Sequence, residues 1–354
     1  MFTLESGKPK ATGDIKLTSY SHGSGCGCKV APSVLEEILR TDTPSAKNAL
    51  LLVGNETKDD AAVYDMGNGM GLISTTDFFM PVVDDAYDYG RIAAANALSD
   101  VYAMGGRPFL AVAILGWPVE KLPPTLAQKV IAGAKAICAQ AGVSLAGGHT
   151  IDSPEPFFGL AVNGSVSVNN IKRNATAQEG DILYLTKPLG TGILNTALKR
   201  SLISQADMAQ CIASMTQLNS IGVELGVMAH VHALTDVTGF GLLGHLIEMC
   251  EGSNISAEVT YSSIPLMDQV KDLTAKFVYA DNTMRNWKSY ESQVEGVSGE
   301  SLLTLCDPQT SGGLLIAVAP DGEKELLTLL TNTNTLIARI GTMKAKKPKA
   351  VYIL

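Results

Sequence analysis

The chain of 354 residues has few aromatic side chains, which make up 6% of it, and it lacks a basic excess, since 27 Lys and Arg stand against 35 Asp and Glu. A formal net charge of −8 argues against a protein that coats nucleic acid or an anionic membrane surface. The longest apolar run, residues 109–115, falls far short of the roughly 20 residues of a spanning helix. Residues 1–14 contain no apolar stretch of the secretory kind. We therefore expect neither a nucleic acid nor a membrane as partner.

Cysteine and two common catalytic motifs are also scarce or missing. Six scattered cysteines do not form a disulfide framework, so the reducing cytoplasm is the expected compartment. The chain contains no G-x-x-x-x-G-K-[ST] phosphate loop and no G-x-S-x-G nucleophile turn, and the second absence argues against a serine hydrolase. Neither absence excludes a phosphate ligand that is held by backbone amides and a metal ion.

What the chain does contain predicts an α/β protein with many tight turns. Hydrophobic residues make up 46% of it, enough for a large buried core, and 34 glycines accompany the few aromatics. Strands are expected over residues 49–53, 61–65, 71–77, 108–115, 143–146, 157–168, 182–186, 259–261, 313–318 and 350–354. Helices are expected over residues 32–39, 89–104, 124–141, 240–250, in two stretches within 205–229, and after the turn at Gly190 and Gly192. The polar segment 281–301 is expected to be rich in loops.

Composition divides the chain into three parts. Residues 1–48 carry a Gly-rich patch and one helical stretch, which predicts a mobile arm with a short helix. Residues 49–169 hold the first alternating series of strands and helices. A polar stretch over 169–180 has no periodicity, and a C-terminal α/β domain over 170–354 follows it.

The Gly-rich patch reads His22-Gly-Ser-Gly-Cys26-Gly-Cys28-Lys29. Small neighbours leave the backbone free to fold over a ligand, and a nearby lysine lowers the pKa of a thiol. A reactive or ligand-binding thiol is the favoured interpretation. A zinc site is disfavoured because the patch offers only three ligands at an unusual spacing, and the cysteines could also be incidental.

Five aspartates adjoin segments of buried character, although their charge makes burial costly unless it is paired or metal-bound. They are Asp59, Asp60, Asp77, Asp100 and Asp236. The string Ala-Leu-Ser-Asp-Val at 97–101 recurs as Ala-Leu-Thr-Asp-Val at 233–237, which suggests that Asp100 and Asp236 face one shared site. Converging carboxylates suit Mg²⁺ that is shared with substrate phosphates. Helix capping or structural ion pairs are the alternative.

Three further features are less specific. Gly147-Gly148-His149-Thr150 after a strand would allow close approach of a phosphate or base, and Gly190-Thr-Gly192 at a helix start is similar but weaker. Residues 306–313 form a shaped turn for which structural and functional interpretations are balanced. His245, on an amphipathic helix, is expected to be a packed or capping residue.

Taken together, seven blocks in one order resemble the selenophosphate synthetase (selenide, water dikinase) family over nearly the whole chain. The blocks are 21–29 (SHGSGCGCK), 55–63 (NETKDDAAV), 74–80 (STTDFFM), 96–101 (NALSDV), 146–149 (AGGH), 235–241 (TDVTGFG) and 306–313 (CDPQTSGG). The wider superfamily, which includes aminoimidazole ribonucleotide synthetase and thiamine monophosphate kinase, is similar in the Asp-rich blocks but lacks the Gly-Cys-Gly-Cys-Lys arm.

The resemblance implies a two-domain α/β fold in which the sheets of two N-terminal domains pair into a dimer barrel. It implies synthesis of selenophosphate, AMP and phosphate from ATP, selenide and water, with residues 49–169 as the ATP/Mg²⁺-binding and dimerisation domain. Partners would be a second copy of the chain and a selenium-delivery protein. Cofactors would be several Mg²⁺ ions and a monovalent cation such as K⁺.

The resemblance also implies roles for individual residues. Cys26 matches the essential Cys or selenocysteine, Lys29 joins it as a catalytic residue, and Cys28 matches a less critical neighbour. The Mg²⁺ ligands would be Asp60, Asp100 and Asp236. The ATP contacts would be Lys29, Thr57, Lys58, Asp59, Asp77, Asp100, Gly148, His149 and Thr150.

The sequence departs from the family at two places, and two rival functions remain at this stage. The first dozen residues match nothing in the family. The block at 281–286 begins Asp-Asn where the family usually has Gly-Gly, so a phosphate contact there is in doubt. One rival is another ATP-dependent enzyme of the same superfamily, which would release ADP without needing selenide. The other is a thiol-based selenium or metal carrier, which would not need several Mg²⁺ ligands.

Overall fold

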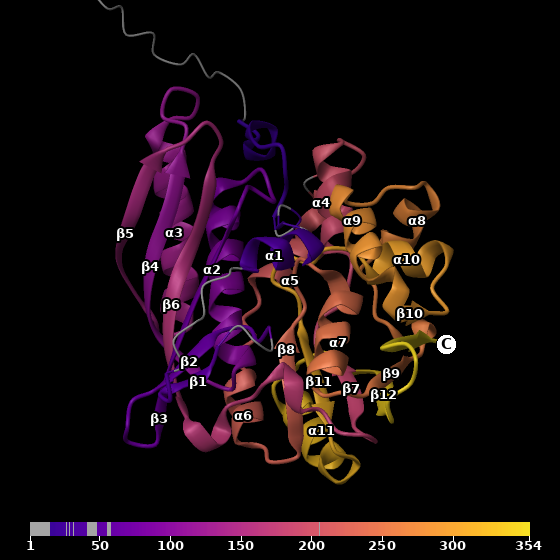
Figure 1. Ribbon diagram of the computed structural model, residues 1–354. Helices are drawn as coiled ribbons and strands as arrows, with labels where there is room; N and C mark the ends of the chain where they lie inside the picture. Colours follow the sequence, from indigo (N-terminus) through magenta and orange to yellow (C-terminus); the bar gives the residue numbers. More distant parts are fainter. Residues whose placement is uncertain are drawn as a thin grey trace, which may run out of the picture.

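The computed structural model describes residues 15–25, 27, 29–30, 32–40, 48–54, 58–204 and 206–354. Cys26, Cys28 and Thr57 therefore lie outside the described residues, as do parts of the expected arm. In the described chain, two mixed α/β halves lie side by side, and each is built on its own sheet (Figure 1).

The first half contains a sheet in the order β1-β2-β3-β6-β4-β5. Its strands are β1 (Leu51–Val53), β2 (Ala62–Asp65), β3 (Met70–Phe79), β4 (Arg107–Trp117), β5 (Ser144–Asp152) and β6 (Phe157–Ser167). The strand β6 pairs antiparallel with β3 and β4, and β4 pairs parallel with β5. A parallel pair needs a crossover, and α3 (Pro124–Gln140) supplies it.

Helix α2 (Ala86–Ala103) lies between this sheet and the second half, and almost all of it is buried. Small residues allow this: a Cβ atom on Gly90 would lie 1.9 Å from the carbonyl oxygen of Val130 in α3. Ala93 and Ala97 belong to the same core as Ile193 and Met215 of the second half. The small residues of α2 therefore allow close helix packing, which places Asp100 between the two halves.

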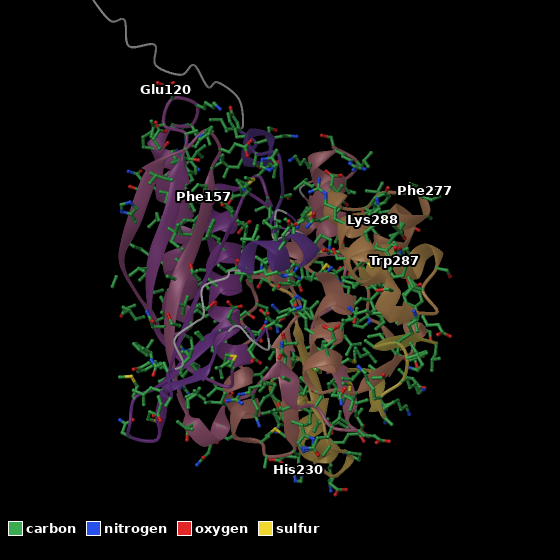
Figure 2. All side chains as sticks on the ribbon, viewed as in Figure 1. Glu120, Phe157, His230, Phe277, Trp287 and Lys288 are labelled. Atoms are coloured by element: carbon green, nitrogen blue, oxygen red, sulfur yellow. The ribbon has the colours of Figure 1, made fainter. Side chains whose placement is uncertain are left out.

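The second half contains a sheet in the order β10-β13-β9-β12-β7-β11-β8. Its strands are β7 (Ile182–Leu185), β8 (Val231–Asp236), β9 (Ser256–Val259), β10 (Val294–Glu295), β11 (Leu314–Val318), β12 (Ala338–Lys344) and β13 (Val351–Ile353). Its helices are α4 (Thr191–Lys199), α5 (Ala209–Thr216), α6 (Gly222–Val227), α7 (Gly241–Gly252), α8 (Val270–Ala275), α9 (Asp281–Tyr290), α10 (Gly299–Leu305) and α11 (Glu323–Asn332). Figure 2 places Phe157 on the first half and Trp287 and Lys288 on α9 of the second.

The prediction of a loop-rich segment over 281–301 is wrong, because α9 occupies its first half. The buried face of α9 is polar: Asn282, Thr283 and Asn286 are all buried. The side-chain amide of Asn286 donates to the carbonyl oxygens of Gly239 and Cys306, at 2.9 and 3.1 Å. Tyr290 is buried on this helix as well, but most of its residues are polar, and this low apolar content is typical of a loop.

Other elements also differ from expectation, and α8, α10, α11, β10 and β12 were not predicted. The two long helical stretches expected within 205–229 are the short helices α5 and α6, which residues 217–221 separate. The strand β5 continues to Asp152, well past the predicted end at residue 146. The strand β9 begins at Ser256 and ends at Val259, and Tyr261 starts a turn of 3₁₀ helix. Contacts with neighbouring strands and helices decide where these elements begin and end, and the local sequence says little about those contacts.

Candidate functional site

A cavity of about 310 Å³ lies between the two halves of the chain and is lined mainly by charged side chains. We call it the acidic cavity. Its charged lining consists of Lys29, Lys58, Asp59, Asp60, Asp77, Asp100, Asp236, His245 and Glu248. Leu35 and Leu39 of α1 (Pro32–Leu39) also line it, and α1 lies across the space between the halves (Figure 1). The predicted metal ligands Asp60, Asp100 and Asp236 are therefore brought together.

Two of the predicted metal ligands are oriented by threonine hydroxyls. The hydroxyl of Thr235 donates to Oδ1 of Asp60 at 2.9 Å, and the hydroxyl of Thr75 donates to Oδ2 of Asp100 at 2.5 Å. Sequence reasoning missed both threonines. The sequence does mark both threonines by their position: Thr235 directly precedes the site residue Asp236, and Thr75 stands two residues before the site residue Asp77.

A buried relay connects Asp77 to the second half of the chain. The side-chain amide of Asn96 donates to Oδ2 of Asp77 at 2.5 Å, and its Oδ1 accepts from the backbone N–H of Ser311 at 2.7 Å. Lys29 Nζ lies 3.5 Å from the same Oδ2 of Asp77. The side-chain amide of Asn282 in α9 donates to the carbonyl oxygen of Lys29 at 3.2 Å. The lysine of the Gly-rich patch is thus held at the cavity from both halves.

Burial and mutual repulsion raise the pKa of the three converging carboxyl groups. For Asp60 and Asp100, loss of hydration is the largest cause, and the charge of Asp236 is the next largest. Loss of hydration also raises the pKa of Asp236, against the effect of a hydrogen bond from Ser99. Such a group of carboxylates is stable in its ionised form only when a cation neutralises it.

Two oxygen atoms in this cavity are left without a hydrogen-bond partner among the described residues, namely Oδ2 of Asp60 and Oδ2 of Asp236. Buried carboxylate oxygens normally have a partner, and oxygen ligands are those that Mg²⁺ prefers. In the described chain, no group of three or more His, Cys, Asp and Glu side chains is arranged to enclose a metal ion by itself. The carboxylates therefore fit divalent ions whose remaining ligands come from a bound polyphosphate or water.

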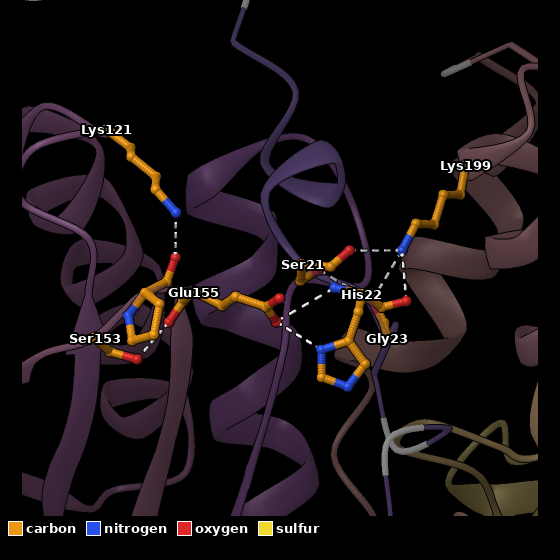
Figure 3. A network of polar contacts seen from close by, with 8 residues as sticks. Ser21, His22, Gly23, Lys121, Ser153, Glu155 and Lys199 are labelled. Carbon is orange, nitrogen blue, oxygen red and sulfur yellow. Dashed lines mark hydrogen bonds and ion pairs between the residues drawn. The ribbon is translucent and has the colours of Figure 1, made fainter.

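The Gly-rich segment is held in place by a network that we call the loop clasp, formed by Lys199 and Glu155 (Figure 3). Lys199 Nζ at the end of α4 donates to the carbonyl oxygens of Ser21, His22 and Gly23 at 2.8, 3.1 and 3.2 Å. From the first half, Oε2 of Glu155 accepts from the backbone and ring Nδ1 of His22 at 3.3 and 2.7 Å. Both halves of the chain thus fix the segment that leads to position 26.

The structure places Gly148, His149 and Thr150 away from the acidic cavity. They lie on β5, the outer strand of the first sheet, and all three are exposed. At Gly148 the φ angle is +155°, and a Cβ atom would lie 2.2 Å from the carbonyl oxygen of Ala113. This glycine therefore allows close pairing with β4. Within one chain, these three predicted ATP contacts do not meet the aspartates.

Two motifs have structural roles. The amides of Gly190 and Thr191 donate to Oε1 of Gln309, and those of Gly192 and Ile193 donate to Oδ2 of Asp307. The turn at 190–192 is therefore occupied by the 306–313 segment and does not offer its amides to a phosphate. This is a correction to the interpretation of that turn as a ligand loop.

His245 has the structural role expected from the sequence. Its Nε2 accepts from the backbone N–H of Thr238 at 3.1 Å, and its Nδ1 lies 3.3 Å from Glu248. It thereby fixes the turn that follows β8 and Asp236. Among the described residues, no helix is both long and apolar enough to cross a membrane.

Comparison with protein families and known proteins gives a consistent result. Residues 58–166 match the N-terminal domain of AIR synthase related proteins, and residues 178–353 match the C-terminal domain. A "Selenide, water dikinase" of Aeromonas salmonicida (strain A449) is 52% identical over 331 residues, which are 94% of this chain and 96% of that protein. The one of Yersinia pseudotuberculosis is 52% identical over 339 residues, which are 96% and 97% of the two chains.

Solved structures share the fold at low identity. Thiamine-monophosphate kinase from Stenotrophomonas maltophilia superposes with a TM-score of 0.63 at 22% identity, over 87% of this chain and 92% of that one. The hydrogenase maturation protein HypE, solved in complex with ATP, gives 0.63 at 20% identity, over 87% of both chains. These likenesses bear on the fold alone.

Proposed function

The chain belongs to the selenide, water dikinase family and makes selenophosphate in an ATP-dependent reaction, and we propose that the acidic cavity is its catalytic site. In that reaction ATP, selenide and water give selenophosphate, AMP and phosphate. The observation that carries the proposal is the pair of buried, unpartnered oxygens of Asp60 and Asp236 in a cavity that also holds Asp100 and Lys29.

Asp60, Asp100 and Asp236 would hold Mg²⁺, the metal that the oxygen-only ligand set favours. When bound, the ions supply neutralisation of phosphate charge, which is the main requirement of phosphoryl transfer. A requirement for K⁺ rests on the family resemblance alone.

The other ATP contacts would come from both sides of the cavity. Lys29 and Lys58 would neutralise phosphate oxygens, while Asp59 and Asp77 would accept hydrogen bonds. Oδ1 of Asp59 accepts from the backbone N–H of Asn174 at 2.8 Å, which fixes this carboxylate at the cavity. Thr57, which lies outside the described residues, is proposed on resemblance.

We propose two successive transfers. The γ-phosphoryl group passes first to selenide, and water then attacks the β-phosphate of the remaining ADP. Lys29, held by Asp77 and Asn282, would position the phosphates for both steps. Cys26, for which no placement is described, would position or deliver hydrogenselenide through its thiolate without forming a bond to selenium.

Electron paramagnetic resonance of Mn²⁺, used in place of Mg²⁺, tests the metal site. With a non-hydrolysable ATP analogue, the wild-type protein is expected to bind Mn²⁺, and Asp236→Asn is expected to bind at least one ion fewer per chain, because one carboxylate ligand has lost its charge. The matched control is Asp321→Asn, at an exposed carboxyl group of the second half. Equal Mn²⁺ binding by all three proteins would refute the assignment.

We also propose that the functional unit is a homodimer formed through the first sheets, in the barrel that the resemblance implies. Nearly all of β5 is exposed, and the outward side chains Phe78, Phe109 and Ile151 are about half exposed. Such an apolar sheet face suggests an interface. A second copy would bring its own Gly148, His149 and Thr150 to the ATP that the aspartates hold.

Co-expression of two inactive variants tests this arrangement. We expect Asp100→Asn and His149→Ala each to have little activity as homodimers. In the mixed dimer, one of the two sites combines a native Asp100 with a native His149, so a random mixture should recover about a quarter of wild-type activity. If each site belonged to a single chain, the mixture would remain inactive.

The loop clasp gives a further prediction. Lys199→Met removes the donor to three carbonyl oxygens and is expected to lower kcat roughly 10- to 100-fold, because the Gly-rich segment loses its fixed position. Binding of Mg²⁺-ATP, measured by calorimetry, should stay near wild type. Lys199→Arg should recover part of the loss, and Lys324→Met, at an exposed lysine of α11, should have no effect. A wild-type kcat in Lys199→Met would show that the clasp is dispensable.

The remaining assignments are proposals with partial support. The division into an arm at 1–48, an ATP/Mg²⁺-binding and dimerisation domain at 49–169 and a C-terminal domain at 170–354 is supported by the two sheets, which fall on either side of residue 169. A cytoplasmic location suits an easily oxidised substrate, and the four described cysteines are free thiols. A selenium-delivery protein as partner rests on the resemblance.

A further inference from the structure

A second cavity, of about 200 Å³, is lined in part by the Gly-rich segment. We call it the loop cavity. Its lining includes His22, Ser24 and Gly27 of that segment, Asn195 and Lys199 of α4, and Asn282 of α9. Lys29, two residues beyond Gly27, lines the acidic cavity. One short segment therefore forms part of the wall of both cavities, and position 26 stands next to Gly27 in the sequence.

The size of the loop cavity restricts what it can hold. Pockets for ligands the size of a drug or nucleotide occupy roughly 300–1,000 Å³. At about 200 Å³ the loop cavity is below that range, and the acidic cavity, at about 310 Å³ in one chain, is within it. The loop cavity is suited to a compact ligand that is distinct from ATP.

The lining of the loop cavity carries more positive than negative charges, and the lining of the acidic cavity carries more negative than positive ones. The loop cavity has Lys199 and Arg200 against the single carboxylate of Asp281. Among the described residues, no carboxylate lies within ion-pair distance of Lys199, whose Nζ contacts only backbone carbonyl oxygens, so its charge is not cancelled. In the acidic cavity, carboxylates outnumber lysines by six to two. A small anion that carries no metal is therefore attracted to the loop cavity and repelled from the other.

The loop cavity also has polar groups whose hydrogen bonding is incomplete. Asn195 is 3% exposed, and its Oδ1 has no partner among the described residues. Its Nδ2 has only the sulfur atom of Met215, at 3.9 Å. The buried Oγ of Ser24 is also without a described partner. Unsatisfied buried polar atoms are rare in proteins, and a bound ligand is one explanation for them.

We propose that the loop cavity binds the selenium substrate as the hydrogenselenide anion, before its transfer to the phosphate. This rests on the proposed function, because it assigns the second substrate of that same reaction. Hydrogen selenide is acidic enough to be a monoanion at neutral pH, and it is compact. Binding there is non-covalent and places selenium against the Gly-rich segment, in a cavity that the carboxylates of the acidic cavity do not line.

Steady-state kinetics under anaerobic conditions test the proposal with two variants that leave the loop clasp intact. Asn195→Leu removes the unpartnered amide, and Arg200→Gln removes a cation whose only described ion pair is with exposed Asp281, at 3.4 Å. Each is expected to raise KM for selenide roughly tenfold, with KM for ATP unchanged. Arg339→Gln, which breaks a comparable exposed pair with Glu323 at 3.2 Å, is the matched control and should match wild type. An unchanged KM for selenide in both variants would overturn the proposal.

A binding measurement separates this proposal from the proposed function. Equilibrium dialysis with ⁷⁵Se-labelled hydrogenselenide and Asp236→Asn, which is expected not to turn over, should show binding that Asn195→Leu abolishes. Retention of label in that double variant overturns the proposal, and so does displacement of the label by orthophosphate at equal concentration, which would indicate a phosphate site. Asn195→Ser replaces Asn195→Leu if the latter does not fold. If the wild-type protein formed no selenophosphate, the proposed function would fail, and dialysis would still report on the cavity.

Discussion

Asp100→Asn is expected to lower selenophosphate formation by roughly 10²–10³-fold or more, because one charged ligand of the proposed metal site is lost from a water-poor cavity. The side chain keeps its volume, and Thr75, which now donates to Oδ2, can still bond to the amide oxygen. A rate assay with saturating ATP and Mg²⁺ measures the effect. Asp272→Asn, at an exposed position on α8, is the control. Activity within a few-fold of wild type would contradict the role of Asp100.

The same substitution should stabilise the metal-free protein while it removes activity. Burial and the charges of Asp236 and Asp77 raise the pKa of Asp100 in the folded state, so the folded protein binds this proton more tightly than the unfolded chain does. Stability of the metal-free protein therefore falls as the pH rises from the unfolded carboxyl pKa, about 3.9, through the raised folded value. Melting temperatures of the metal-free protein should therefore fall as the pH is raised above about 3.9, and this fall should be smaller in Asp100→Asn.

Added Mg²⁺ should reverse that trend, because it neutralises carboxylates that are ionised. The increase in melting temperature on addition of Mg²⁺ and an ATP analogue is expected to grow as the pH is raised, because fewer protons then compete for the same oxygens. An increase that did not depend on pH would show that the three aspartates do not bind the metal.

Cys26→Ser is the second large effect: selenophosphate formation should fall on the order of 10³-fold or more, as for loss of a catalytic nucleophile. A serine hydroxyl does not ionise near neutral pH, so it cannot replace a thiolate that holds selenium. Mg²⁺-ATP binding should be unchanged. Cys28→Ser, two residues away, is the matched control and should retain most activity. Full activity in Cys26→Ser would refute its essential role.

Chemical labelling provides an independent check of that assignment. Burial raises the pKa of the Cys138 thiol to about 11 and those of Cys250 and Cys306 to about 12. It also raises the pKa of Cys211. These four thiols are therefore almost fully protonated at neutral pH and unreactive. Brief treatment with iodoacetamide should modify only the two cysteines of the Gly-rich segment.

The sequence predicted the acidic cavity better than it predicted the elements around it. The repeated Ala-Leu-Ser/Thr-Asp-Val string indicated that Asp100 and Asp236 face one site, and both line the acidic cavity. That inference succeeded because a buried aspartate among apolar neighbours is stable only when its charge is paired or bound to a metal ion. The alternating pattern of strands and helices likewise predicted the mixed architecture of both halves.

What the sequence did not predict depends on contacts between distant segments. Most residues of helix α9 are polar, and its buried asparagines donate to carbonyl oxygens of distant segments. The turn at 190–192 has the glycines of a ligand loop, but Gln309 and Asp307 take its amides, and only the fold brings them there. The loop clasp joins Glu155 and Lys199 to His22 across long stretches of chain, and no local pattern marks it.

Anaerobic ³¹P NMR of the protein with ATP, Mg²⁺ and selenide, beside a sample without selenide, tests the central claim most directly. Our account predicts that selenophosphate, AMP and phosphate appear together, that no ADP accumulates, and that Asp236→Asn forms none of these products. Accumulation of ADP alone, with or without selenide, would contradict it: the acidic cavity would then be an ATP site of another kind, and the selenium role of Cys26 would be wrong.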